Sequence, residues 1–460
     1  MRSRGQVVSA LLVLAVVAAG GVYLQREVGP RALAAGPVGV APSGAWFCPH
    51  GGGTDWQVTL ELANPGPNPV GVKVTELSGG KPSKPASFTV EPGTELQIPE
   101  AANARGASSM IEYFGGWVAA GWVAHAGGGE TGVAAEPCIP QAGGVWYLPD
   151  GTTRENEDAY VVVMNPFAVT ATISIVLYTD DGEPIRTGAW TNLVLKPHRS
   201  EAFHVNANAL GYGTVSAVVD AATGRVVAAT LGVSGLGGLR SSVGVLGDLP
   251  RQVILPGGFD QGRTDLVIMN PVGSRPTVTG AVLSADASQA IASLGQEGPN
   301  AASTQTYPVT TNGPSTIVLQ SSSGVAVARR SYGVVSDQGS TEGASAPARA
   351  WVILPAVAGY PSHPGLVLAN PGTESAEVTL SFLPAGTGPM PAAVTVVVPP
   401  GRTVAAPKAF VEAKPFAAVI AVASSGTFVP AAASYSLGRE GFATYAVSLG
   451  VPVPEAWAPS

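Results

Sequence analysis

An Asn-Pro pair that ends an apolar run occurs four times in this chain, and this repeat constrains the fold more than any other feature. Asparagine ends a strand by bonding its own backbone, and proline lacks the N–H that would continue the ladder. The asparagines lie 101, 105 and 100 residues apart. The spacing therefore predicts four copies of one strand-rich module. The four runs are Leu60–Pro65, Val161–Pro166, Leu266–Pro271 and Leu366–Pro371.

Two further markers recur with the same period. A short apolar run ends in a proline 14 to 16 residues before each asparagine: Trp46–Pro49, Trp146–Pro149, Val253–Pro256 and Val352–Pro355. Two β-branched runs flank a glycine-containing tip 52 to 59 residues after each asparagine, over residues 110–125, 215–233, 317–334 and 419–437. The markers predict module 1 over residues 46–140, module 2 over 145–250, module 3 over 251–347 and module 4 over 350–452, with a tail at 453–460.

Each module has the pattern of a β-sandwich. In module 2, residues 172–178 alternate polar and apolar side chains, as a strand with one buried face does. About seven such short strands fit each module, which is what two packed sheets need, whereas a propeller blade carries four. The 59 glycines and 40 prolines also argue against helices. Because the linkers are short and contain proline, we expect a semi-rigid rod or a packed arc.

The N-terminus carries an export signal. Residues 7–24 are uncharged and apolar, and as a helix they would cross most of a bilayer. Arg2 and Arg4 precede them, which places the N-terminus in the cytoplasm. We therefore predict a signal anchor over residues 1–25, a linker over 26–45 and a single-pass membrane protein with an extracellular C-terminal region. The alternative is a signal peptide cleaved near residues 32–34, which would leave a secreted protein.

The chain has two cysteines, Cys48 and Cys138. They lie near the start and the end of module 1. In an oxidising compartment an even, module-spanning pair is most simply a disulfide. A catalytic thiol is the weaker interpretation.

The strand that ends in Asn-Pro, the alternating strand after it, the Pro-Gly turn at Pro400-Gly401 and the closing hairpin resemble immunoglobulin-like repeats of secreted bacterial proteins. The whole chain is similar to an actinobacterial family of membrane-anchored extracytoplasmic proteins of unknown function. The resemblance implies four tandem immunoglobulin-like β-sandwiches after one N-terminal transmembrane helix, an all-β fold. It brings no catalytic residues to carry over. Module 3 departs from it, because a clear Pro-Gly turn before Tyr307 is missing.

No motif of a known catalytic site is present. The chain lacks Gly-x-Ser-x-Gly, His-Glu-x-x-His, a phosphate loop and paired Cys-x-x-Cys knuckles. Residues 127–132 fit Gly-x-Gly-x-x-Gly but lead into no helix, so we interpret them as a flexible loop. The net charge of −7 is spread without a basic stripe, which excludes nucleic acid as an expected partner. The five histidines are scattered, and we expect no cofactor.

Two groups of residues are weak ligand candidates. Asp150, Glu155, Glu157 and Asp158 cluster in one acidic loop, and clustered carboxylates on a loop are typical of calcium sites. The alternative is a solvated turn, which the central Arg154 favours.

Exposed tryptophan can stack on sugars, and module 1 is rich in this residue. Trp56, Trp117 and Trp122 are the candidates for glycan binding. The alternative is core packing, which the shared repeat position of Trp46 and Trp146 favours.

These observations predict a non-enzymatic protein of the cell envelope, in which a rod of sandwiches projects from the membrane as a scaffold or interaction surface. One alternative is recognition of cell-wall glycan or of another envelope protein through module 1. A hydrolase acting on the envelope is a third, weaker hypothesis, since it would need a cleft built from residues that form no local motif.

Overall fold

The computed structural model describes residues 43–457 except for 181, 261–262, 272, 312, 333–337, 357–361, 385–389, 415–416 and 438–442. The predicted signal anchor, the alternative cleavage site and the last residues of the tail lie outside the described residues. Among the residues that are described, no helix is both long and apolar enough to span a bilayer. Residues 42–460 form one compact unit, which is described below by itself.

The predicted all-β fold is confirmed, and each module contributes two antiparallel sheets. In module 1 the outer sheet has the order β1-β6-β3-β4 and the inner sheet the order β5-β2-β7-β8. The outer strands are β1 (Gly44–Cys48), β3 (Val70–Leu77), β4 (Ala86–Val90) and β6 (Ser108–Phe114). The inner strands are β2 (Gln57–Asn64), β5 (Thr94–Ala101), β7 (Ala119–His125) and β8 (Val133–Pro137).

Module 2 repeats this order, with β12-β11-β14-β9-β17 outside and β13-β10-β15-β16 inside. Its outer strands are β9 (Val145–Leu148), β11 (Ala171–Thr179), β12 (Leu193–Leu195), β14 (Val215–Thr223) and β17 (Val245–Leu246). Its inner strands are β10 (Glu157–Asn165), β13 (Arg199–His204), β15 (Val227–Ser234) and β16 (Leu239–Val243).

Modules 3 and 4 follow the same plan. The outer strands of module 3 are β18 (Gln252–Asp260), β20 (Val278–Leu283), β21 (Ser288–Ala290) and β23 (Gly313–Ser321), and the inner ones are β19 (Arg263–Asn270), β22 (Ser303–Thr310), β24 (Ala326–Tyr332) and β25 (Gln338–Glu342). The outer strands of module 4 are β26 (Ala350–Ile353), β28 (Ala376–Leu383), β29 (Val394–Val398), β31 (Ala418–Ser425) and β34 (Val451–Pro452). Its inner strands are β27 (Ser362–Asn370), β30 (Arg402–Ala405), β32 (Val429–Leu437) and β33 (Ala443–Leu449), and the helix α2 (Lys408–Ala413) follows β30.

The two runs around each glycine tip do not form the predicted hairpin. In module 1, β6 pairs with β1 and β3, whereas β7 pairs with β2 and β8 in the other sheet. Gly115 has a φ of 84°, a conformation that glycine adopts without strain, so the chain turns here from one sheet to the other. The pairing consequently differs from that of immunoglobulin domains, in which the first strand lies in the same sheet as the second and fifth.

The Asn-Pro asparagines end their strands as predicted. The Asn64 side chain is fully buried, and its Oδ1 accepts a hydrogen bond from the backbone N–H of Gly66 at 2.9 Å. Its Nδ2 donates to the carbonyls of Asn68 and Val90. Asn165, Asn270 and Asn370 each donate Nδ2 to the carbonyl four residues later in the same way. One amide group thus stabilises the turn and attaches it to a second loop in every module.

The repeated tryptophan lies in the core, and its position corrects the alignment of module 4. The indole N–H of Trp46 donates to the carbonyl of Val118, and that of Trp146 to the carbonyl of Val226. The equivalent bond in module 4 comes from Trp351, which donates to Phe428. The sequence marker placed Val352 there, one residue too late, because the proline that ends the marker is displaced by one residue in this module.

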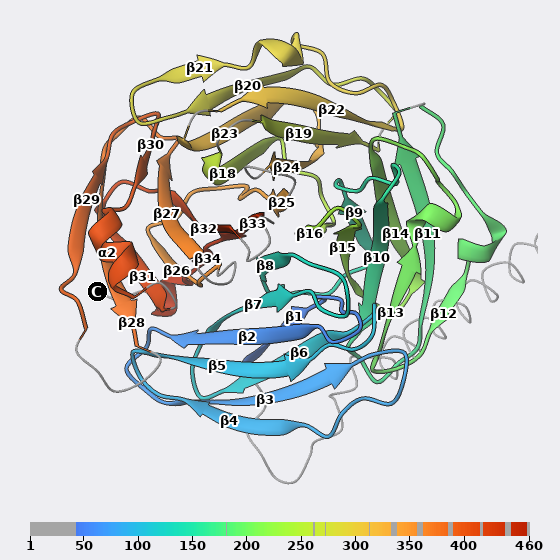
Figure 1. The fold of residues 1–460 in the computed structure, drawn as a ribbon, viewed down its shortest axis with the longest axis horizontal. Helices are drawn as coiled ribbons and strands as arrows, with labels where there is room; N and C mark the ends of the chain where they lie inside the picture. The colour runs from blue at the N-terminus through green and yellow to red at the C-terminus, as the bar shows by residue number, and fades with distance from the viewer. Residues whose placement is uncertain are drawn as a thin grey trace, which may run out of the picture. The chain divides into compact units, whose positions relative to one another are not determined.

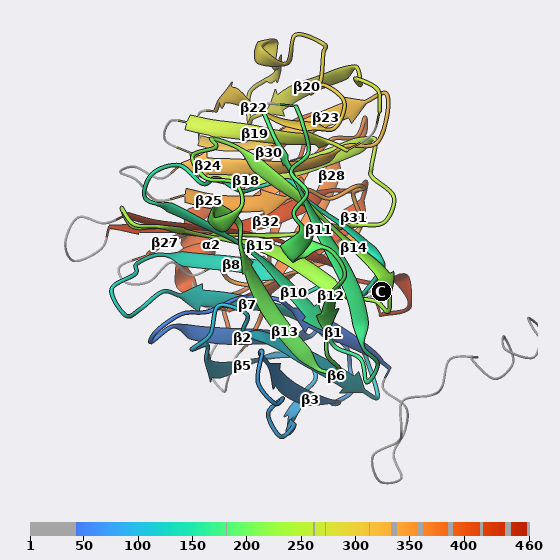
Figure 2. The same ribbon diagram turned by 90° about the vertical axis from the view of Figure 1, so that its right-hand side faces the viewer.

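The modules form a closed ring, where a semi-rigid rod or a packed arc was expected. Each module contacts the next, and module 4 contacts module 1: the N–H of Glu95 donates to the carbonyl of Pro384 at 3.0 Å. Equivalent backbone hydrogen bonds occur at two other interfaces. The N–H of Ser200 in module 2 donates to the carbonyl of Ser78 in module 1, and the N–H of Thr403 in module 4 donates to the carbonyl of Ser284 in module 3. The last inner strands β8, β16, β25 and β33 meet at the centre of this ring (Figure 1). Figure 2 shows the same ring turned by 90°. Because a similar contact recurs between successive modules, each module is rotated by a similar angle relative to the one before it. Four such rotations bring module 4 back to module 1.

The hydrophobic cores continue across the interfaces. One cluster of buried residues joins Trp56 and Trp122 of module 1 to Leu231 of module 2 and to Leu354 of module 4. A second cluster joins Val123 of module 1 to the core of module 4. Apolar surface is therefore buried between modules as well as within them, and its burial stabilises the closed ring.

Candidate functional site

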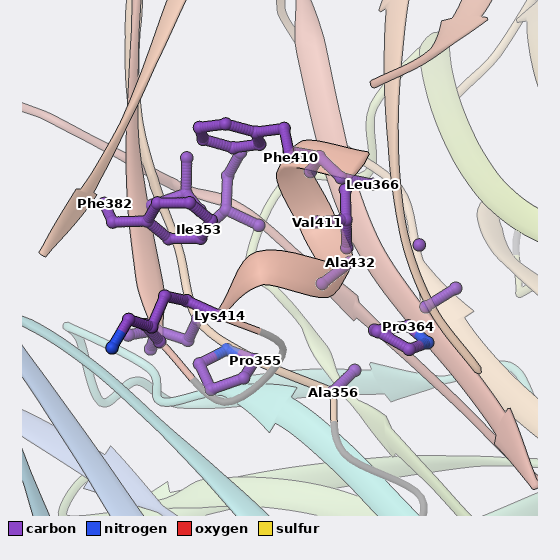
Figure 3. A pocket seen from close by; sticks show the side chains of 15 residues that line it. Ile353, Pro355, Ala356, Pro364, Leu366, Phe382, Phe410, Val411, Lys414 and Ala432 are labelled. Carbon is purple, nitrogen blue, oxygen red and sulfur yellow. The ribbon is translucent and has the colours of Figure 1, made fainter. Parts of the chain in front are cut away.

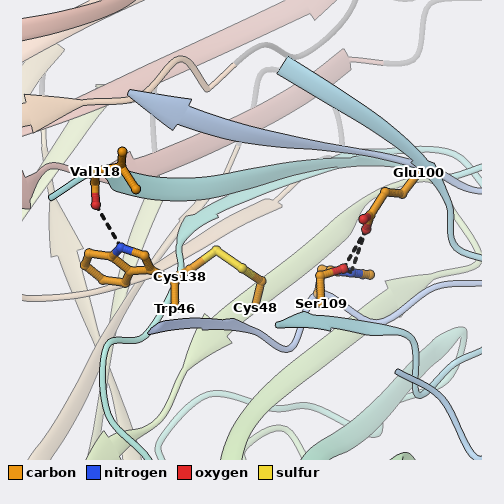
Figure 4. Close-up of a disulfide and its surroundings, with 7 residues drawn as sticks. Trp46, Cys48, Glu100, Ser109, Val118 and Cys138 are labelled. Atoms are coloured by element: carbon orange, nitrogen blue, oxygen red, sulfur yellow. Dashed lines mark hydrogen bonds and ion pairs between the residues drawn. A yellow bond between two sulfur atoms is a disulfide. The ribbon is translucent and has the colours of Figure 1, made fainter. Parts of the chain in front are cut away.

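The predicted disulfide is present and lies inside module 1. Cys48 and Cys138 are bonded and buried, and they connect the end of β1 to the segment that follows β8 (Figure 4). Phe47 and Ile139, their neighbours, form an additional backbone bridge. The covalent bond therefore joins the outer sheet of module 1 to the strand nearest the centre of the ring. A disulfide in this position indicates an oxidising, extracytoplasmic compartment.

The candidate binding site is a cavity of about 440 Å³ formed by loops of modules 1 and 2. We refer to it as the loop cavity. Four segments from two modules meet here, and backbone hydrogen bonds from Gly238 to Thr131 and from Gly235 to Asn156 join three of them. Its lining comprises residues 129–131, 154–158, Asn206, Leu210, 233–235 and Gly237.

Two acidic side chains of the loop cavity are paired with arginines. Glu130 is ion-paired with Arg105 and accepts the indole N–H of Trp56 at 2.8 Å. Arg240 donates to Glu157 at 2.9 Å.

The third acidic side chain is Asp158, which lies 2.8 Å from Nε2 of His204. Arg105 and Arg240 pair with two of the carboxylates and Arg154 also lines the cavity, so most of its negative charge is offset and it has no strong demand for a metal ion. It instead presents carboxylate, amide and guanidinium groups that hydrogen-bond neutral, hydroxyl-rich molecules.

The structure separates the four residues of the predicted calcium loop. Glu155, Glu157 and Asp158 line the loop cavity, but Asp150 does not. Among the described residues, no group of three or more His, Cys, Asp or Glu side chains is arranged to hold a metal ion.

Asp150 is buried between modules 2 and 3, where its Oδ1 accepts a hydrogen bond from Nε of Arg330 at 3.0 Å. Arg240 approaches its other oxygen at 3.8 Å. Burial alone would raise the pKa of Asp150, but the charges of Arg330 and Arg240 hold this pKa below its ordinary value. Asp150 is thus a charged group that joins two modules.

The three candidate tryptophans are buried. Trp56, Trp117 and Trp122 expose 1%, 6% and 2% of their surface, so none offers a face on which a sugar could stack. Trp117 packs edge-on against Trp46 at 6.4 Å between ring centroids. The three indole rings pack in the core of module 1, as the alternative of core packing expects.

A buried hydrogen-bonded chain lines a second cavity of about 290 Å³ in module 1. Ser109 donates to Glu100 at 2.5 Å (Figure 4). Its hydroxyl oxygen lies 3.1 Å from Nε2 of His50. The Nδ1 of His50 is 2.7 Å from the carbonyl of Gly51, which orients the ring. Burial lowers the pKa of His50 to about 4 and raises that of Glu100 to about 7. Ser109 is fully buried between its two partners, so its hydroxyl is not presented to a substrate.

A third pocket is apolar and lies in module 4 beneath α2. Phe382 and Phe410 stack with their ring centroids 4.2 Å apart, and Lys414 borders the pocket (Figure 3). The cavity holds only about 40 Å³, which suits one small apolar group. Among their described residues, modules 1 to 3 have no α-helix at this position, and module 2 has only the three-residue 3-10 helix Val205–Ala207 there.

The sequence indicated one side of the loop cavity and missed the other. The acidic loop was recognised as a ligand candidate, whereas Glu130 belongs to the glycine-rich loop that was interpreted as merely flexible. Asn206 comes from a third segment: it accepts the N–H of Ala159 and donates to the carbonyl of Glu157. No local motif links these segments, so only the packing of two modules brings them together.

The fold thus defines a disulfide-bonded all-β protein with a ring of paired sheets. The chain belongs to a family of unknown function (DUF5719), whose model matches residues 100–352. No curated protein matches it.

Two solved structures are similar in part. One is the Thermotoga maritima protein 1070, at 15% identity, with a TM-score of 0.19 and cover of 22% of this chain and 97% of that one. The other is a tetra-tandem repeat in the extending region of a large adhesion protein, at 11% identity, with a TM-score of 0.08 and cover of 85% and 93%.

Proposed function

We propose that this chain is a non-enzymatic protein of the cell envelope, tethered to the membrane by residues 7–24, whose ring of four sandwich modules presents loops to partners. The disulfide between Cys48 and Cys138 carries the proposal, because it supports a location outside the cytoplasm. The uncharged segment 7–24 behind Arg2 and Arg4 supports the membrane tether. A secreted ring, released by cleavage near residues 32–34, is the alternative.

The chemistry of the cavities supports a binding role over a catalytic one. The carboxylates of Glu130 and Glu157 are held in ion pairs with arginines, and Asp158 is hydrogen-bonded to His204. A nucleophile must reach its substrate, and Ser109, in the one Ser-His contact described above, is buried.

The location is tested by labelling intact cells. A single cysteine introduced at the exposed Glu374 should react with an impermeant maleimide in cells, and protease added outside should release the ring while residues 1–25 stay in the membrane. The native disulfide leaves no other free thiol among the described residues. Labelling only after lysis would contradict export, and full release of the ring into the medium would support the cleaved form.

Glycan binding remains a second candidate function, and the loop cavity is the observation that favours it. Its wall is polar and nearly charge-balanced, and Leu210 and Leu236 expose 75% and 62% of their surface beside it. Such a site fits uncharged sugar units, with hydroxyls bonded to the wall and apolar ring faces on the leucines.

The test measures retention of the ring on isolated wall polysaccharide. Glu155→Ala and Leu210→Ala should each weaken retention about tenfold or more, and Glu374→Ala, at an exposed position of module 4, is the matched control. No retention of the unmodified ring would eliminate glycan binding. Equal retention of all variants would show that the sugar binds elsewhere.

A further inference from the structure

The interface between module 4 and module 1 differs from the other three in its covalent connection. Modules 1 and 2, 2 and 3, and 3 and 4 follow one another along the chain through short linkers. Module 4 reaches module 1 only through non-covalent contacts between residues 323 positions apart, such as Glu95 and Ala418. This interface can therefore open while the chain remains continuous through the other three.

The closing interface also buries acidic groups, and none of the described cations is paired with them. Oε2 of Glu95 accepts the backbone N–H of Ala418 at 2.6 Å, and Oε1 accepts the amide of Gln97 at 2.9 Å. Glu61 on the neighbouring strand β2 is 3% exposed, and Glu95 is 4% exposed. The groups facing Glu95 are thus a backbone amide from β31, a neutral side chain of its own strand and a second carboxyl group on β2.

The protonation of these carboxyl groups changes in the neutral range. Burial raises the pKa of Glu95 to about 7, against the lowering effects of Ala418 and Gln97. Burial and the charge of Glu95 raise the pKa of Glu61 well above its ordinary value. Opening the interface exposes both carboxyl groups to water and returns their pKa values to the ordinary range. Since the open form then binds fewer protons than the closed form, the equilibrium constant for opening increases as pH rises from about 4.5 to about 7.

The two surfaces of this interface are complementary and different, so each interface is head-to-tail. A head-to-tail contact closes within one chain or joins one chain to the next, depending on geometry and concentration. At the equivalent position of the interface between modules 1 and 2, Ser108 and Ser200 make a 2.7 Å hydrogen bond. The chain thus already contains the contact that a second copy would make.

We propose that module 1 of one chain binds module 4 of a second copy of this chain when the ring opens, and that the carboxyl groups of Glu95 and Glu61 keep the ring closed in acid. The partner is the same protein, and the product is a larger closed ring or a linear assembly. The proposal is independent of export and of glycan binding.

The experiment measures exchange between two differently tagged preparations of the ring, mixed at pH 5 and at pH 8. We expect monomers without exchange at pH 5, and mixed-tag oligomers at pH 8 by co-purification and light scattering. From the pKa shift of Glu95 alone, the equilibrium constant for opening should increase by about two orders of magnitude between pH 5 and pH 8. Circular dichroism at each pH checks that the sheets persist.

Glu95→Gln keeps a neutral acceptor for Ala418 and should hold the ring closed at both pH values. Glu374→Gln, an exposed glutamate of module 4, is the matched control and should exchange as the wild type does. Monomers without exchange at pH 8 would overturn the proposal, and so would equal exchange of wild type and Glu95→Gln. Loss of the sheet signal at pH 8 in place of exchange would also overturn it.

Discussion

The interface between modules 2 and 3 and the interface between modules 4 and 1 bury charge in opposite ways. At the former, Asp150 lies between Arg330 and Arg240 and remains ionised. At the latter, Glu95 meets a backbone amide and is protonated up to about neutral pH. The interface between modules 2 and 3 is therefore most stable at pH values at which its carboxyl group is charged. The interface between modules 4 and 1 is most stable at pH values at which its carboxyl group is neutral.

This difference shows how a repeat becomes a specific assembly. The residue that pairs with the position before each Asn-Pro asparagine is Glu95, Ser200, Thr304 or Thr403. Three of these equivalent positions carry hydroxyls, and only the closing interface carries a carboxyl group. Because each interface has its own chemistry, wrong pairings leave buried polar groups unpaired, which favours one order of modules.

The largest expected effect comes from breaking the ion pair between modules 2 and 3. Asp150→Ala leaves Arg330 buried without its partner, and we expect a loss of about 3–5 kcal/mol in the free energy of unfolding. Denaturant titration measures it.

The double variant Asp150→Ala with Arg330→Met removes both charges and should recover much of this loss. A double variant as unstable as Asp150→Ala would contradict the ion-pair interpretation.

The next largest effect is a pH dependence of opposite sign at the two interfaces. The pKa of Glu95 is raised in the folded ring, so its contribution is fully present below about pH 4.5 and is lost as pH rises to about 7, a change of about 3 kcal/mol. The pKa of Asp150 is lowered, so its contribution is present above its ordinary pKa and is lost as pH falls further into the acid range.

Stability curves of wild type and Glu95→Gln between pH 4 and 8 test the first contribution. The two curves should converge at the acid end and separate toward neutral pH, where the variant should be the more stable. A constant difference across the range would show that Glu95 does not titrate in this way.

A smaller effect follows from removing the acceptor at the closing interface. Glu95→Ala leaves the buried N–H of Ala418 without its partner, and we expect a loss of about 1–3 kcal/mol at pH 5. Thermal unfolding of this variant beside Glu95→Gln separates the lost hydrogen bond from the lost carboxyl group. An unchanged midpoint for Glu95→Ala would mean that water replaces the carboxyl oxygen.

The smallest effect is expected at the hydroxyl pair between modules 1 and 2. Ser200→Ala removes a neutral hydrogen bond to Ser108, which we expect to cost about 0.5–1.5 kcal/mol without a pH dependence. Stability curves of wild type and Ser200→Ala between pH 4 and 8 measure this loss. If the difference between them changed with pH as it does for Glu95→Gln, the chemistry of the side chain would not distinguish the interfaces.

Much of the fold could be predicted from the sequence, because it depends on local chemistry. Asn64 and its equivalents end strands through bonds to residues two and four positions away, so the short pattern suffices. The cysteine pair and the core position of Trp46 followed from compartment and repeat position. The acidic loop was identified as a ligand candidate, and three of its four residues line the loop cavity.

The sequence by itself determined the four repeats, their strand-rich character and the disulfide, since each is encoded in residues that act on their own neighbours or through a fixed period. Only the tertiary structure decided that the repeats close into a ring, that Asp150 leaves its loop for Arg330, and that Glu130 joins Glu155 at one cavity. The physical reason is that these outcomes depend on the angle at which one module packs on the next. That angle arises from the summed contacts of distant side chains, and no short pattern in the chain records it.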